Sequence, residues 1–238
     1  MKFSLFSLLI AVFLASPVSH AGNITGIVTL KGTPPPEIEM TPLEGDPVCG
    51  ALHEEKPMTQ FYVVGKNGEL ADAVVLLKDA DGKDITGEST GAGAPPAVLD
   101  QKGCLYVPTI LAVQTGQKIV VKNSDPCIHN VHCTPTVTGN EEKNDVQAPG
   151  DADLTYTFAR QEMFLRFKCD IHPWMFAWVS VIDSPYYSVS DKDGKFAIKN
   201  VPPGKYTVVA NHRKLGKQTQ TIEVTDKNVT VNFTFEAK

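Results

Sequence analysis

The stretch MFLRFKCDIHPWMFAWVSVI, residues 163–182, carries the strongest structural signal in this chain. Its two ends, 163–168 and 176–182, are rich in β-branched and aromatic residues and predict strands. The short segment between them, 169–175, spaces cysteine, histidine and methionine as C-x-x-H-x-x-M. We therefore expect two neighbouring strands joined by a loop that carries soft ligand atoms.

Further strand-like runs occur on both sides of this pair. Turn formers bound them, such as Gly-Lys-Asn-Gly at 65–68 and Asn-Ser-Asp-Pro at 123–126. No stretch longer than two turns shows helical periodicity, so the sequence predicts an all-β chain. The segment 86–96 is rich in Gly, Ala, Ser and Pro and is expected to be a loop or linker. The other predicted strands are 24–30, 61–64, 73–78, 110–113, 118–122 and 154–158.

The first residues have the pattern of a cleaved export signal. Lys2 precedes an apolar run at 3–14, and Ser19-His20-Ala21 follows as a small-x-small cleavage site. We expect 1–21 to be a signal peptide removed after Ala21, and the mature protein to be periplasmic or secreted. No later stretch approaches the roughly 20 apolar residues needed to span a bilayer.

The charge balance argues against a nucleic-acid partner. The chain has 22 Lys and Arg against 27 Asp and Glu, a net charge of −5. It has no basic stripe that could neutralise phosphates.

Five cysteines make an odd number, and an oxidising compartment pairs what it can. We expect Cys169 to be the cysteine without a disulfide partner, because the residues around it have the pattern of a metal-binding loop. Our preferred pairing joins Cys49 with Cys104 and Cys127 with Cys133. Four cysteines allow three connectivities, and the spacing alone leaves the other two open.

The residues around Cys169 supply three of the four donors of a copper site. Cys169, His172 and Met175 lie in one tight loop, and His129 follows the predicted strand 118–122. One thiolate, two imidazoles and a weak thioether form the trigonal His2Cys site with an axial Met that is typical of blue copper proteins.

Two motifs together resemble the cupredoxins, most closely the amicyanin type: H-N-V-H at 129–132 and C-x-x-H-P-x-M at 169–175. The resemblance covers roughly 98–183. It implies a Greek-key β-sandwich with one type-1 copper on the four donors named above. It also implies that the backbone amide of Asn130 donates a hydrogen bond to the sulfur of Cys169.

The cysteines that flank the first histidine depart from that pattern. A disulfide between Cys127 and Cys133 would stiffen the ligand loop, whereas a competing interpretation has both bind a second metal with His132. An extended strand would turn His132 to the face opposite the first ligand, which favours a surface or hydrogen-bonding role. We expect His53 in a loop and His212 at the surface.

The C-terminal segment, 184–238, has a different sequence pattern. The signals D-x-D-G-x-F at 191–196 and P-P-G-x-Y at 202–206 describe β-hairpins. They resemble the carboxypeptidase regulatory-like domain, a small transthyretin-like β-sandwich. The tail is short for an independent sandwich, so we expect strands of 22–97 to complete it. Two domains in series, with the copper domain at 98–183, is the alternative.

The whole chain also resembles periplasmic proteins labelled methylamine utilisation proteins, in its D-P-V-C at 46–49 and its Pro-Pro-Gly tail. That label gives no role by itself.

These features predict a non-enzymatic carrier of single electrons, with a periplasmic cytochrome or a dehydrogenase as partner. An apolar patch of Pro173, Trp174 and Phe176 around His172 is the expected docking surface. A copper carrier or storage protein is one alternative, although the sequence lacks Met-rich and His-rich tracts. An envelope scaffold or binding module with structural copper is the other.

Overall fold

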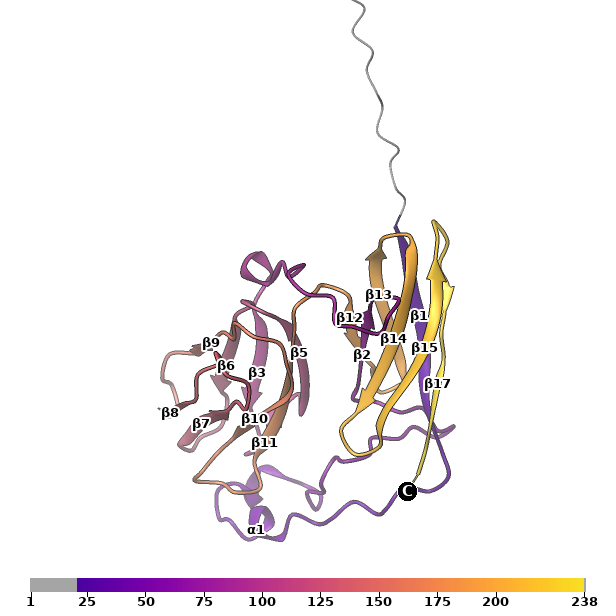
Figure 1. Ribbon diagram of the computed structural model, residues 1–238. Coiled ribbons are helices and arrows are strands. Elements are labelled where there is room, and N and C mark those ends of the chain that lie inside the picture. Colours follow the sequence, from indigo (N-terminus) through magenta and orange to yellow (C-terminus); the bar gives the residue numbers. More distant parts are fainter. Residues whose placement is uncertain (1–20, 238) are drawn as a thin grey trace, which may run out of the picture.

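The computed structural model describes residues 21–237 and consists mainly of β-strands arranged in two sandwiches that lie side by side (Figure 1). The all-β fold class expected from the sequence is confirmed. Residues 1–20 of the expected signal peptide lie outside the described residues. Within 21–237, no helix has the length and apolar character needed to cross a bilayer.

The central sandwich is formed by the middle of the chain. Its five-stranded sheet has the order β5 (Ile110–Gln114), β11 (Phe176–Ile182), β10 (Glu162–Lys168), β7 (His129–Thr134) and β8 (Lys143–Gln147). Its four-stranded sheet has the order β4 (Tyr106–Val107), β3 (Ala97–Gln101), β6 (Ile119–Asn123) and β9 (Leu154–Tyr156). Because β7 and β10 are neighbours in space although β8 and β9 separate them in sequence, the strand order is of the Greek-key kind.

The terminal sandwich takes strands from both ends of the chain. One sheet contains β13 (Lys195–Val201), β1 (Gly22–Lys31) and β16 (Val229–Thr230), and β17 (Phe233–Glu236) also pairs with β1. The other has the order β12 (Tyr187–Val189), β2 (Ala73–Lys78), β14 (Gly204–His212) and β15 (Gly216–Val224). The central sandwich therefore lies between β2 and β12 in sequence. The exact domain limits at 98 and 183 stay a prediction.

The segment 32–72, which joins β1 to β2, runs along one end of both sandwiches (Figure 1). It contains α1 (Thr41–Glu44) and the 3-10 turn η1 (Gly50–Leu52). The strand predicted at 61–64 is wrong, since this stretch makes only an isolated bridge between Val64 and Leu70. A second 3-10 turn, η2 (Gly91–Gly93), lies in the expected loop at 86–96.

Strand β2 shows how the two sandwiches meet. Its uninterrupted apolar run is buried on both faces, unlike an ordinary half-exposed strand. Val75 and Leu77 face the core of the terminal sandwich, whereas Val74 and Leu76 pack in a separate cluster with Ile182 of the central sandwich. The interface between the sandwiches is therefore apolar.

Candidate metal centre

Two neighbouring strand ends bring the expected donors together. Strand β10 ends at Lys168, which its antiparallel pairing with β7 sets opposite His132. Cys169 follows β10 directly, while His129 is the first residue of β7. The same register carries both residues to one end of the sheet, and His172 lies in the turn before β11.

Three donor atoms converge there in a buried position. His129 Nδ1 lies 2.9 Å from His172 Nδ1. Cys169 Sγ lies 3.6 Å from His172 Nδ1 and 4.0 Å from His129 Nδ1. The point equidistant from these three atoms is about 2 Å from each, close to the bond lengths that imidazole nitrogen and thiolate sulfur make with a small metal ion. The donor set therefore fits the expected ion in both chemistry and spacing.

Met175 completes the loop that holds these donors. It is fully buried, in the same core as Cys169. Its backbone N–H donates to the carbonyl of His172 at 2.9 Å, and the N–H of Cys169 donates to the carbonyl of Met175 at 3.1 Å. Main-chain hydrogen bonds thus close the loop on itself. That the Met175 thioether is the axial ligand stays a prediction.

Contacts among the cluster set its protonation. Burial alone would lower the pKa of His129, but hydrogen bonds with Asp125 and Cys169 outweigh burial and raise that pKa to about 9. Burial would raise the pKa of Cys169, yet His129 and nearby backbone amides bring it below its usual value. Burial and the charge of His129 lower the pKa of His172. Because these contacts favour the protonated form of His129, binding of a metal at its Nδ1 releases a proton.

Asp125 is a residue of this site that the sequence analysis did not single out. Its buried carboxylate lies 3.0 Å from His129 Nε2, on the side of the ring away from the donor cluster. The same carboxylate accepts hydrogen bonds from the backbone N–H groups of Gly103, at 2.6 Å, and Cys104, at 2.8 Å. Asp125 therefore fixes the orientation of the His129 ring. In the sequence, the feature that could have identified Asp125 is its position four residues before His129.

Asn130 ties the two ligand segments together. Its backbone N–H lies 3.5 Å from Cys169 Sγ, the contact that the cupredoxin resemblance implies. Its side-chain oxygen accepts hydrogen bonds from the N–H groups of Asp170, at 2.7 Å, and Ile171, at 3.3 Å. The amide side chain thus holds the start of the ligand loop against β7.

We expect Asp125→Asn to weaken copper binding about 10- to 100-fold, the usual cost of losing the partner that orients a metal-bound histidine. The amide keeps the shape but removes the charge beside His129. Competition with a chelator measures the change. Asp153→Asn, at an exposed position, is the matched control and should bind copper as the wild type does. An Asp125→Asn protein of unchanged affinity would contradict this role.

Cys49 and Cys104 form a disulfide, one of the two that the sequence analysis preferred. It joins the segment between β1 and β2 to the loop before β4, next to the donor cluster. Trp174 lies against the same loop, since its indole N–H donates to the carbonyl of Cys104 at 3.2 Å. The ligand loop is thus braced by a covalently fixed neighbour.

The expected disulfide between Cys127 and Cys133 is wrong, because both thiols are free. Cys133 lies on β7 with its side chain in the core of the central sandwich, whereas Cys127 precedes the strand and packs near Cys49 and Cys104. Four residues of extended strand from His129 to Cys133 already span roughly 13 Å, and a disulfide needs α-carbons within about 7 Å.

The competing second metal site at Cys127, His132 and Cys133 is not formed either. His132 Nδ1 lies 2.7 Å from a carboxylate oxygen of Asp170, and His132 Nε2 lies 2.7 Å from one of Glu142. It therefore has the hydrogen-bonding role that the sequence favoured.

The two remaining histidines described lie apart from these donors. His53 is in a loop as expected, with Nε2 2.8 Å from the carbonyl of Gly103. The surface position predicted for His212 is wrong, because its ring is buried against Tyr62 and Phe235 in the terminal sandwich. Burial lowers the pKa of His212 to about 4.

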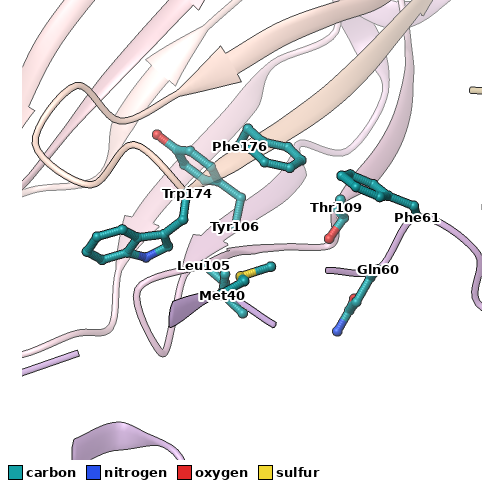
Figure 2. A pocket seen from close by; sticks show the side chains of 8 residues that line it. All are labelled: Met40, Gln60, Phe61, Leu105, Tyr106, Thr109, Trp174 and Phe176. Carbon is teal, nitrogen blue, oxygen red and sulfur yellow. The ribbon is translucent and has the colours of Figure 1, made fainter. Parts of the chain in front are cut away.

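The residues expected to form a docking patch differ in exposure. Pro173 is exposed, whereas Trp174 and Phe176 are half-buried. Figure 2 shows both aromatic side chains around a small cavity of about 20 Å³ that Met40 and Phe61 of the segment 32–72 also line. That volume is enough for about one water molecule and not for a larger ligand.

One family model matches the chain, that of the carboxypeptidase regulatory-like domain, over residues 172–236. The matched range begins in the ligand loop and includes β11 of the central sandwich. It leaves out β1 and β2, which the terminal sandwich also contains. A search of curated protein sequences returned no match.

Solved structures similar to the chain include copper proteins. A copper-containing nitrite reductase from Thermus scotoductus SA-01 is 19% identical with a TM-score of 0.33, and the match covers 43% of this chain and 26% of the reductase. The chain thus spans about a quarter of that enzyme. A Cu(I) form of an amicyanin variant is 19% identical over 45% of this chain and 97% of amicyanin, with a TM-score of 0.33.

A purple cupredoxin from Nitrosopumilus maritimus is 20% identical, with a TM-score of 0.31, over 36% of this chain and 98% of the cupredoxin. The chain thus contains a Greek-key β-sandwich that carries the donor cluster and a terminal β-sandwich, most of whose strands lie in the range that is similar to a carboxypeptidase regulatory-like domain.

Proposed function

We propose that this protein carries single electrons between redox partners in the periplasm, through one type-1 copper ion held by His129, Cys169, His172 and Met175. The observation that carries the proposal is the buried convergence of Cys169 Sγ with the two Nδ1 atoms at 2.9–4.0 Å. Such a set of one thiolate and two imidazoles suits copper.

The bound ion would supply a one-electron couple, and the chain would keep its surroundings fixed. Asp125 orients His129, the Asn130 side chain holds the loop, and Trp174 braces it on Cys104. The Asn130 N–H near Cys169 Sγ stabilises negative charge on the sulfur. With each donor held by its own neighbours, little has to move when the charge of the site changes, which suits electron exchange.

Burial of the proposed ligands favours electron transfer over delivery of copper to another protein. His172 is only 7% exposed, and the segment 32–72 packs beside it through the Cys49–Cys104 disulfide. A carrier that hands over its metal needs an accessible ligand. Retention of the ion therefore fits this site better than rapid metal exchange.

Electrons would enter and leave the site through exposed apolar side chains that lie next to the proposed ligands. Beside the exposed Pro173, Ile128 is 46% and Ile171 47% exposed, and each is the direct sequence neighbour of a histidine ligand. We place the docking of a redox protein, such as a cytochrome or a dehydrogenase, at these residues, with Trp174 and Phe176 supporting the loop from beneath.

Voltammetry of the copper-loaded protein tests the proposed function. We expect a reversible one-electron couple, together with copper that a mild chelator removes much more slowly than a small reductant reduces it. Fast removal by the chelator without a reversible couple would instead favour a copper carrier. The same measurements on Asp153→Asn should reproduce the wild type and control for handling.

A further inference from the structure

A second cluster of soft ligand atoms lies beside the donor site. The sulfurs of Cys49, Cys104 and Cys127 and a ring nitrogen of His172 all lie within 4.8 Å of one another. Cys104 Sγ is 3.6 Å from the free thiol of Cys127. Three sulfurs from three separate segments thus meet at one place, and only two of them are joined in the disulfide.

The Sγ atoms of Cys49, Cys104 and Cys127 form a triangle, whereas thiol–disulfide exchange requires three sulfurs in a line. A thiol that exchanges with a disulfide attacks along the sulfur–sulfur axis, which would put Cys127 Sγ about 5.6 Å from Cys49 Sγ. The two atoms lie within 4.8 Å instead. Sulfurs that share a metal ion with bonds of about 2.3 Å sit roughly 4 Å apart, close to the 3.6 Å between Cys104 Sγ and Cys127 Sγ.

We propose that reduction of the Cys49–Cys104 disulfide opens a second metal site, a trithiolate of Cys49, Cys104 and Cys127 bordered by His172, which binds Cu(I). Thiolates are soft ligands and favour Cu(I) over harder ions. A dithiol reduces the bond by exchange, delivers two electrons and two protons, and leaves as its own disulfide. Cu(I) then binds as the thiols lose protons.

The cluster does not depend on the disulfide alone for its position. The N–H of Cys49 donates to the side chain of Asp46 at 2.8 Å, and the N–H of Cys104 donates to Asp125 at 2.8 Å. The indole of Trp174 holds the carbonyl of Cys104. The two half-cystines therefore stay in place when the sulfur–sulfur bond opens.

The surroundings of the three sulfurs suit a soft metal ion. Cys49 and Cys104 are fully buried against Met40 and Leu43, whereas Cys127 is partly exposed. An apolar wall on the inner side protects thiolates from oxidation, and the exposed edge at Cys127 gives the metal access.

Counting bound Cu(I) before and after reduction tests the inference. The full mature protein is reduced with dithiothreitol, freed of it by desalting without oxygen, and titrated with Cu(I) against a chelator. We expect one equivalent for the disulfide form and two for the reduced form, the second with ultraviolet thiolate-to-copper absorption. Cys127→Ser should lose the second equivalent after reduction. Cys133→Ser, a free cysteine outside the cluster, should keep it.

The outcome separates this site from the proposed electron-transfer site. Reduced Cys169→Ser should still bind one equivalent, at the three cysteines, and its disulfide form none. Equal binding before and after reduction in the wild type would overturn the inference, as would a second equivalent that survives Cys127→Ser. If the disulfide form of the wild type binds no copper but the reduced form binds one, the electron-transfer proposal fails and the trithiolate site stands.

Discussion

Cys169→Ser is expected to abolish the intense visible absorption of the Cu(II)-loaded protein. In a site of this kind the colour comes from charge transfer from the thiolate to copper, and serine offers a hard oxygen in place of the soft sulfur. The sulfur lies 3.6 Å from His172 Nδ1 and 4.0 Å from His129 Nδ1, within reach of the same ion. Optical spectra of both proteins, loaded with equal copper, measure the change.

Cys133→Ser is the matched control, because Cys133 is a buried free cysteine in the same sandwich that is not one of the converging donors. It should keep the full colour. If the wild type binds copper stoichiometrically but shows only the faint bands of a nitrogen and oxygen site, the assignment of Cys169 as a ligand is wrong. A colour that survives Cys169→Ser would lead to the same conclusion.

Gly26→Ala is expected to destabilise the protein by about 3 kcal/mol, at the upper end of the cost of overpacking. A methyl group on Gly26 would stand 1.7 Å from the backbone oxygen of Val231, which no real contact allows. This is the crossing where β1 changes partner from β16 to β17, and the Val231 N–H donates to Thr25 there. Urea unfolding followed by circular dichroism gives the change in free energy.

Gly93→Ala provides the control, since a methyl group at Gly93 would meet nothing within 4 Å. It should change the free energy of unfolding by less than about 1 kcal/mol. Equal stability of Gly26→Ala and the wild type would mean that β1 does not lie against the last strands of the chain. Because β1 and those strands are about 200 residues apart, this result bears directly on the terminal sandwich.

Local pattern predicted several strands to within a residue or two. The stretches 73–78 and 176–182 are strands with those bounds because uninterrupted apolar or aromatic runs leave the backbone few alternatives. The polar stretch His129–Thr134 lacks such a run and becomes a strand because β10 and β8 pair with it on both sides. The run at 61–64 shows the converse: it has the composition of a strand but does not form one, because apart from one isolated bridge it has no pairing partner.

The cysteines show where spacing misleads. Only five residues lie between Cys127 and Cys133, a spacing that suggests a local disulfide, but the extended strand carries Cys133 into the core. The disulfide between Cys49 and Cys104 closes a separation of 55 residues. Packing of the segment 32–72 against the loop before β4 brings Cys49 to Cys104, and Cys127, from the loop before β7, packs against the same cluster.

The sequence by itself determined the all-β class and the spacing of the C-x-x-H-x-x-M loop, because strand periodicity and ligand spacing are local properties of the chain. Tertiary structure alone decided that Asp125 orients His129 and that three cysteines converge beside His172. Those contacts form between segments whose approach is set by the burial of shared apolar faces, and no local pattern encodes which distant faces meet.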